Sequence, residues 1–232
     1  MAKWEFPEGK SVAVVTSWDN GTATDRIMLR MLEQYGYKGT FYVCPELIGT
    51  EGYLNLDDLK QIADAGHEIG SHSLSHPHLE NLTAPECQRQ VAESKTWLEE
   101  KLGTPVESFA YPYGFAQGAD WVAEAVRKAG YRSARTTDTV SLITASMLKT
   151  GDPMRLPVTA HFSEGFLDVQ RKWDEIEASD GGIFHLWGHS HTLGADPHDW
   201  VDFECILGFL GGISHVWYGT VGELMAEVLQ RR

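Results

Sequence analysis

Two histidines four residues apart are the side chains of this 232-residue chain that first point to metal chemistry. His72 and His76 lie in the stretch SHSLSHPH, and a helical turn there would put both imidazoles on one face, within reach of a single cation. A lone histidine is more often a core or surface residue. The pair at this spacing beside a strand end favours a metal site, and His78, two residues further on, is expected to be structural.

An acid and an amide stand side by side earlier in the chain, in the sequence TSWDNG. Asp19 and Asn20 follow a β-branched run and precede Gly21. One of them could serve as a general base and the other as a metal ligand. The alternative is an Asx turn that caps the next helix, and the stretch alone does not separate the two interpretations.

Two later clusters carry groups suited to acyl transfer. The segment FAYPYG (109–114) predicts a turn whose backbone N–H groups could face an oxyanion, although a plain turn is the more frequent explanation. The segment GGIFHLWGHSHTL places His185 and His189 on either side of Trp187, on one strand face if the extended geometry persists. One of these histidines could be a general acid, because packing alone explains their concentration poorly.

Alternating strands and helices are expected to hold these clusters. Strands are predicted at 11–17, 38–44, 67–70, 107–111, 131–136 and 182–187. Helices are predicted at 25–35, 56–66, 85–101, 119–129, 168–178 and from 221 onward. The alternation indicates parallel strands with crossover helices, and about seven repeats favour a closed or nearly closed α/β barrel in one domain, 1–232. Reactive groups in such barrels sit at the carboxyl ends of the strands, where the polar clusters fall.

The charge and the cysteine content limit the possible functions further. The chain has 19 Lys and Arg against 33 Asp and Glu, a formal charge of −14, which disfavours nucleic acid and anionic membranes as partners. Cys44, Cys87 and Cys205 have no CxxC spacing, so they are expected to be buried, reduced thiols. The N-terminal residues lack the apolar core of a signal peptide, which predicts a cytoplasmic location unless a leader was trimmed.

Taken in order, the four clusters resemble the motifs of the polysaccharide deacetylase superfamily, also called NodB-like domains or carbohydrate esterase family four. SWDNG resembles the TFDDG motif, SHSLSH the HSxxH motif, AYPYG the RxPYG motif, and IFH the LxH motif. The resemblance spans residues 11 to about 225. It implies a distorted (β/α)-type barrel, a divalent ion that is usually zinc and sometimes cobalt or nickel, and hydrolysis of an N-acetyl or O-acetyl group of a carbohydrate.

The resemblance also assigns roles around the metal. Asp19 matches the family's catalytic base. Asn20 matches its metal-binding acid, and His72 and His76 match its two histidine ligands.

The remaining roles fall on the third and fourth motifs. Tyr113 would lend its backbone N–H to the oxyanion. The catalytic acid would fall on His185, because Ile183 and His185 reproduce the LxH spacing, and His189 is the competing candidate.

Two positions depart from the family's pattern. Asn20 stands where the family has an aspartate, and a neutral amide is a weaker ligand, so reduced metal affinity is predicted whether the change is natural or engineered. Ala110 stands where the family has an arginine that orients the base. Arg135, in YRSARTT at the end of the next predicted strand, could replace it through a bidentate pair with Asp19, and a surface arginine is the alternative.

Two competing functions follow from these departures. The first is a non-catalytic carbohydrate-binding relative, in which Asn20 and Ala110 mark a decayed site. The second is hydrolysis of a cyclic or other non-sugar amide, which would suit a metal-poor member of the superfamily. The surviving base and acid favour the deacetylase. The motifs do not select among chitooligosaccharide, peptidoglycan, xylan and small acetylated metabolites. His161, in the irregular stretch 139–164, is a candidate substrate contact.

Overall fold

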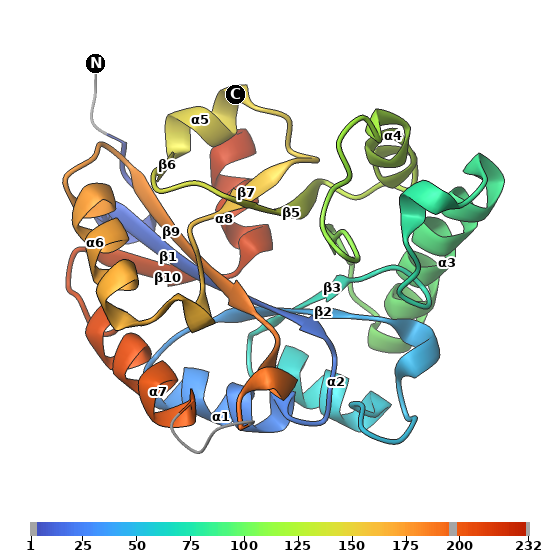
Figure 1. Cartoon of the computed structure of the whole chain (residues 1–232), viewed down its shortest axis with the longest axis horizontal. Helices are drawn as coiled ribbons and strands as arrows, with labels where there is room; N and C mark the ends of the chain where they lie inside the picture. The colour runs from blue at the N-terminus through green and yellow to red at the C-terminus, as the bar shows by residue number, and fades with distance from the viewer. Residues whose placement is uncertain (1–3, 195–198, 231–232) are drawn as a thin grey trace.

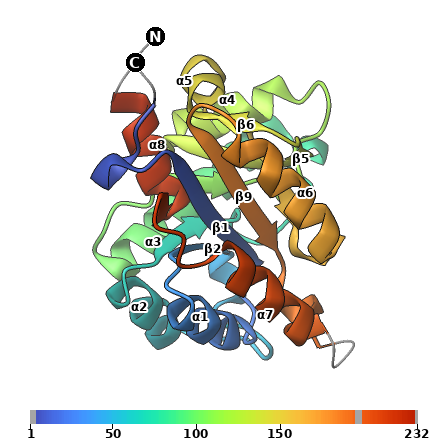
Figure 2. The same ribbon diagram turned by 90° about the vertical axis from the view of Figure 1, so that its left-hand side faces the viewer.

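The computed structural model describes residues 4–194 and 199–230. One curved sheet runs through this part of the chain, and helices pack around its outer side (Figures 1 and 2). The strands are β1 (Val12–Asn20), β2 (Gly39–Val43), β3 (Glu68–Ser71), β4 (Ser108–Ala110), β5 (Ser133–Thr139), β6 (Ile143–Thr144), β7 (Leu156–Val158), β8 (Ala160–His161), β9 (Gly182–Gly188) and β10 (Val216–Gly219). The helices are α1 (Asp25–Gln34), α2 (Leu56–Asp64), α3 (Ala84–Leu102), α4 (Asp120–Lys128), α5 (Ala145–Thr150), α6 (Phe166–Glu177), α7 (Asp199–Leu210) and α8 (Val221–Gln230).

The sheet closes into a barrel with seven strand positions. Parallel pairing runs in the order β9-β1-β2-β3-β4-β5-β7. The gap between β5 and β9 is filled by the segment 156–161, in which β7 pairs with β5 and β8 pairs with β9. The short strands β6 and β10 add further pairing to β9 and β1. The predicted distorted (β/α)-type barrel is confirmed, and one visible distortion is this change of partner at Thr159.

Alternation along β1 explains how an acid reaches the inside of the barrel. Val14 and Trp18 pack in the larger hydrophobic cluster, where Trp18 meets Phe203 of α7 edge to face with ring centroids 5.3 Å apart. Val15 belongs to a second cluster that includes residues of α5 and α8. Because residues two apart on a strand share a face, Asp19 continues the row of Val15 and points away from the α7 side.

The six predicted strands and six predicted helices are all present, with small shifts at their ends. The elements that were not predicted are β6, β7, β8, β10, α5 and α7. Four of them lie in the stretch 139–164, where segments of two to six residues are too short for a periodic pattern. Helix α7 has the sequence DWVDFECILGFL, whose apolar residues do not keep to one face, so it gives no amphipathic signal.

The cysteines follow the expectation only in part. Cys44 and Cys87 are buried and form no disulfide, but Cys205 is exposed, so the expectation of a third buried thiol was wrong. Cys205 lies on the outer side of α7, whose buried side is formed by other apolar residues. Across residues 4–194 and 199–230, no helix combines the length and apolarity that a bilayer span requires.

A buried carboxyl group joins the start of α1 to the loop after β9. Asp25 is fully buried, and its Oδ1 accepts a hydrogen bond from the Ser190 hydroxyl. Ser190 Oγ also lies 3.1 Å from Thr22 Oγ1 and 2.8 Å from Thr24 Oγ1. Burial raises the pKa of Asp25 to about 7; the hydrogen bond from Ser190 opposes the shift, and the charge of Asp19 adds to it. Asp25 therefore keeps its proton well above the pH at which an exposed aspartate ionises.

Replacing Asp25 with asparagine should remove a pH dependence of stability. The unfolded chain releases the Asp25 proton near pH 4 and the folded chain near pH 7, so between these values rising pH destabilises the fold by about 1.4 kcal/mol per unit. Asp25→Asn should therefore gain about 3 kcal/mol relative to the parent between pH 5 and pH 8, as measured by urea unfolding. The exposed control Asn81→Gln, which changes no titratable group, should show a constant difference from the parent. A constant difference for Asp25→Asn would contradict the prediction.

Candidate active site

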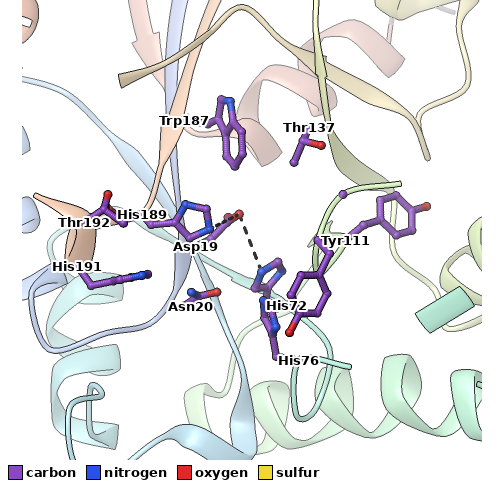
Figure 3. Close-up of a pocket in the computed structure, with 12 residues that line it drawn as sticks. Asp19, Asn20, His72, His76, Tyr111, Thr137, Trp187, His189, His191 and Thr192 are labelled. Carbon is purple, nitrogen blue, oxygen red and sulfur yellow. Dashed lines mark hydrogen bonds and ion pairs between the residues drawn. The ribbon is translucent and has the colours of Figure 1, made fainter. Parts of the chain in front are cut away.

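Side chains from several strand ends line a cavity of about 440 Å³ at the carboxyl edge of the barrel (Figure 3). This volume falls within the range of small-molecule sites. The lining residues are Asp19, Asn20, His72, His76, Tyr111, Tyr113, Gly114, Thr137, Trp187, His189, His191 and Thr192. Most of the site residues predicted from the sequence are therefore brought together, while His185 and Arg135 lie behind the cavity wall.

Asp19 is the buried acid of the cavity. Both carboxylate oxygens accept hydrogen bonds from Nη2 of Arg135, which is completely buried with its guanidinium 4.8 Å from the ring centre of Trp187. Burial alone would raise the pKa of Asp19. The charge of Arg135 and its hydrogen bond to the carboxylate outweigh burial and hold that pKa below its usual range. The carboxylate is therefore ionised at neutral pH.

Arg135 reaches Asp19 from a strand that neighbours the third motif. Ala110 of β4 and Arg135 of β5 are register partners. The guanidinium thus starts one strand away from the position where the motif resemblance puts an arginine, and at the same level of the barrel. This placement explains how Arg135 can pair with Asp19 although Ala110 cannot. The role of Arg135 in orienting a base stays a prediction.

His72 is fixed from behind so that one ring nitrogen faces the cavity. Its Nδ1 lies 2.8 Å from the carbonyl oxygen of Ala110, and because a carbonyl only accepts, Nδ1 carries the proton. Nε2 then lies 3.9 Å from Asp19 Oδ2 with its lone pair free. Burial lowers the pKa of His72 to about 4, although the charge of Asp19 opposes the shift. The imidazole is therefore neutral, as a metal ligand must be.

His76 lies against His72, with ring centroids 4.7 Å apart. The segment between them is no helix: Ser73 and His76 have φ angles of 65° and 64°, and Ser73 Oγ accepts a hydrogen bond from the backbone N–H of His76. The predicted helical turn was therefore wrong, although the two imidazoles do converge. Burial lowers the pKa of His76 as well, which keeps its ring neutral near pH 7.

Asn20 provides the third donor that a cation would need. Its side-chain Oδ1 is buried, lines the cavity wall and has no hydrogen-bond partner within the described part of the chain. With His72 and His76 it forms a set of three neutral donors. No cluster of three or more His, Cys, Asp or Glu side chains suited to a metal ion occurs in residues 4–194 and 199–230. These residues fit a divalent cation only with the Asn20 amide as a ligand, which makes a weak set.

The two histidines that are candidates for the general acid lie at different depths of the barrel. His185 is the register partner of Val15, and its buried Nε2 lies 2.9 Å from Ser17 Oγ, outside the cavity. His189 follows the end of the strand and lines the cavity, with Nε2 3.9 Å from Asp19 Oδ2. Burial lowers the pKa of both histidines, that of His185 to about 3. Of the two candidates, His189 therefore shares the cavity with Asp19, whereas His185 lies deeper in the barrel. Which of them acts as an acid stays a prediction.

Tyr113 forms the exposed rim of the cavity. Its backbone has a φ of 61°, and its ring stacks on His78 with centroids 3.7 Å apart and planes 6° from parallel. The backbone N–H of Tyr113 has no hydrogen-bond partner among the described residues, so it can donate to an incoming oxyanion. His78, expected to be structural, thus supports this rim.

Several lining residues were not singled out from the sequence. Tyr111, Thr137, His191 and Thr192 complete the cavity. One local signal existed at Gly114, whose φ is 87° and where an added Cβ would lie 2.3 Å from Thr137 Oγ1. Only glycine suits that turn, but glycine alone does not identify the strand end that it touches.

His161, the candidate substrate contact, does not line the cavity. Its ring meets the Trp187 ring edge to face with centroids 4.8 Å apart, and its Nδ1 lies 2.6 Å from Ser163 Oγ. His161 therefore supports the wall that Trp187 forms.

Removing the charge of Arg135 should destabilise the fold strongly. Arg135→Met leaves the Asp19 carboxylate buried without its partner, and breaking such a pair costs about 3–5 kcal/mol. The double variant Arg135→Met/Asp19→Asn removes both charges and should recover most of that loss. Urea unfolding at pH 7 measures both values. A loss below about 1 kcal/mol in the single variant, or no recovery in the double variant, would argue against this role of the pair.

Comparison with known proteins assigns the sequence to a family. The family described as polysaccharide deacetylase matches residues 7–134. A peptidoglycan-N-acetylglucosamine deacetylase of Bacillus cereus is 28% identical over 133 residues, which cover 56% of this chain and 58% of that protein. The peptidoglycan-N-acetylmuramic acid deacetylase PdaC of Bacillus subtilis is 28% identical over 116 residues, or 49% of this chain and 24% of PdaC. The matched regions thus span less than two thirds of these relatives.

Solved structures share the fold over nearly the whole chain. A structure from Mycobacterium smegmatis assigned to the polysaccharide deacetylases has a TM-score of 0.71 at 18% identity, covering 98% of this chain and 93% of that one. The Xyl-CE4 domain of a multidomain xylanase from a termite hindgut metagenome has a TM-score of 0.61 at 17% identity, covering 94% and 91%. With the family match over more than half of its residues, this chain belongs to the polysaccharide deacetylase family.

Proposed function

We propose that this chain is a metal-dependent hydrolase that removes an acetyl group from a carbohydrate. The observation that carries the proposal is the buried carboxylate of Asp19, kept ionised by Arg135, with Nε2 of His72 and of His189 each 3.9 Å from its Oδ2. A base, a ligand-type imidazole and an acid-type imidazole thus share one cavity. Relatives named as peptidoglycan-N-acetylglucosamine deacetylases support an acetamido sugar as the substrate class.

A divalent cation would be held by Asn20, His72 and His76. Zinc is the first choice, and cobalt and nickel are the alternatives, because imidazole suits all three. When bound, such a cation polarises the acetyl carbonyl and makes its carbon easier to attack. The neutral state of both imidazoles and the unpartnered Asn20 Oδ1 support this assignment.

The protein's own residues would begin the reaction on the acetyl carbonyl. Asp19 takes a proton from the attacking water, and Arg135 keeps the carboxylate oriented without giving up its own proton. The backbone N–H of Tyr113 donates to the oxygen that gains negative charge as the tetrahedral intermediate forms.

His189 would complete the reaction as the general acid. Burial keeps the pKa of His189 below its ordinary value, so its Nε2 has to gain a proton before it can donate one. Asp19 Oδ2, 3.9 Å away, is the adjacent source of the proton taken from water. That proton passes to the leaving nitrogen or oxygen, the bond to the acetyl carbon breaks, and acetate is released.

A second candidate is a carbohydrate-binding protein without catalysis, and the neutral Asn20 favours it. One structural neighbour, BA3943 of Bacillus anthracis, is named a CE4 family pseudoenzyme, at 21% identity and a TM-score of 0.57 over 95% of this chain and 66% of that one. A mutant of BA3943 is described as having restored enzymatic activity. At this identity the likeness concerns the fold, so activity has to be measured on this chain.

Acetate release separates the candidates. We expect acetate from N-acetylglucosamine oligomers or acetylated xylan in the presence of zinc, and none from cyclic amides. His189→Gln should lower kcat by about 10²–10⁴, whereas the matched change His185→Gln, four residues earlier in the chain and deeper in the barrel, should cost less than about tenfold. Equal losses in the two variants would overturn the choice of His189. Binding of these sugars without any acetate release would favour the second candidate.

The variant Asn20→Asp should bind zinc more tightly than the parent. A unit charge about 4 Å from a divalent ion adds about 2 kcal/mol even at the dielectric constant of water, which corresponds to about thirtyfold in affinity. Competition with a zinc-binding dye measures this without any substrate. The surface variant Asn81→Asp adds the same charge away from the cavity and should leave the affinity unchanged. Equal affinity in parent and Asn20→Asp would remove position 20 from the ligand set.

A further inference from the structure

The loop after β9 brings His189 to the active-site cavity, where its Nε2 lies 3.9 Å from Asp19 Oδ2 (Figure 3). The next residues, Ser190–Thr192, form one turn of 3-10 helix, which we call the Ser190 turn. A hydrogen bond of 3.1 Å from Leu193 N to Ser190 O closes it, and the buried Leu193 side chain fixes its far end in the hydrophobic core. The end of the turn that carries His189 depends on Ser190.

The side chain of Ser190 attaches this turn to the start of α1. It is completely buried, donates to Asp25 Oδ1, and lies 2.8 Å from Thr24 Oγ1 and 3.1 Å from Thr22 Oγ1. A serine hydroxyl has one proton, so a Ser190 that donates to Asp25 accepts hydrogen bonds from the threonines. The His189 ring makes no hydrogen bond of its own among the described residues. Its position therefore depends on these contacts of the neighbouring residue.

The neutral form of Asp25 fits these surroundings better than the ionised form. Asp25 is completely buried, and its Oδ2 has no hydrogen-bond partner in the described part of the chain. A buried carboxylate needs more hydrogen bonds than the one that Ser190 provides, whereas a neutral acid does not. Burial accordingly raises the pKa of Asp25 to about 7, against the hydrogen bond from Ser190 and with a contribution from the charge of Asp19.

No cation compensates a negative charge on Asp25. The segments that pack against it carry these charged or titratable side chains: Asp19 of β1, Arg26 of α1, which pairs with Asp58 of α2, Glu51 of the loop before α2, and His189 and His191 of the loop after β9. Within residues 4–194 and 199–230, none of them forms an ion pair with Asp25. Water can supply the missing hydrogen bonds to an ionised Asp25 only if the Ser190 turn moves away from α1.

We propose that Ser190 and the protonated carboxyl group of Asp25 position His189 beside Asp19. The proposal rests on the proposed function, in which His189 is the general acid. While Asp25 keeps its proton, the Ser190 turn stays against α1 and the His189 ring faces the cavity. When Asp25 ionises, the turn moves outward, and His189 moves away from Asp19 with it. Neither Ser190 nor Asp25 lines the cavity, so both are positioning residues.

Hydrogen exchange of the Leu193 amide, followed by NMR without substrate, tests the proposal independently of activity. This amide donates to Ser190 O, so it exchanges when the Ser190 turn opens. After correction for the intrinsic pH dependence of exchange, its protection factor in the parent should fall by about thirtyfold between pH 5.5 and pH 8, as Asp25 ionises. The amide of Ala134, buried in β5, should remain far better protected at both pH values.

Two variants assign the change to these residues. Asp25→Asn keeps an acceptor for Ser190 but cannot ionise, so it should remove the fall in protection. Ser190→Ala should lower the protection of the Leu193 amide at pH 5.5 as well. Ser94→Ala removes another completely buried serine hydroxyl, on α3, and should behave as the parent.

The pH profile of acetate release adds a readout that a purely structural role would not change. Between pH 6 and pH 8, kcat of the parent with zinc should fall by up to about tenfold more than kcat of Asp25→Asn, since about one tenth of Asp25 is still protonated one unit above its pKa. KM should change little, because the Ser190 turn acts on the proposed acid. Ser94→Ala should follow the profile of the parent.

Several results would overturn the proposal. These are a Leu193 protection factor that does not change with pH, one that equals that of Ala134, a fall that persists in Asp25→Asn, and equal pH profiles of kcat in the parent and Asp25→Asn. If the exchange results are as expected but no sample releases acetate, the proposed function is wrong, and the positioning of His189 by Ser190 and Asp25 is still supported.

Discussion

The pairing of Asp19 with Arg135 is the interaction on which the candidate site depends. Asp19 and Asp25 are both buried, yet their pKa values move in opposite directions, because Asp19 has a guanidinium and Asp25 has a hydroxyl. Without Arg135, burial would favour the protonated form of Asp19, which cannot accept a proton from water. The same charge that keeps the carboxylate ionised also weakens it as a base. This balance suits the role that we propose for Asp19, in which it takes up a proton from water and passes it on to His189.

The register between neighbouring strands of the barrel determines which side chains meet in the site. Trp18 of β1 pairs with Gly188 of β9, so the next residue of each strand, Asp19 and His189, reaches the same level at the mouth. His185 pairs with Val15, well below that level. Parallel strands bring polar residues to one edge, and their register also determines which of two histidines on the same face meets Asp19.

The register between strands is also the feature that could not be predicted from the sequence. The barrel, its main strands and the positions of Asp19 and His72 were predictable, because hydrophobic periodicity and polar strand ends are local patterns. The depth of His185 was not, since the two-residue period of a strand puts it on the same face as His189. The left-handed turn before His76 was missed as well, because it depends on a serine side chain. The contact of Asp25 with Ser190 joins residues 165 positions apart, and no local pattern encodes it.

The neutral donor set at Asn20 has a consequence for the whole fold. In a site with an acidic ligand, removal of the cation leaves a buried carboxylate without compensation, and folding then depends on the metal. Here the charge of Asp19 is already matched by Arg135, and His72 and His76 are neutral, so the cavity holds no uncompensated charge when it contains no cation. Folding therefore does not need the cation to compensate a buried charge. A chain built in this way can keep an intact barrel and cavity without a bound cation, and only the proposed activity would need one.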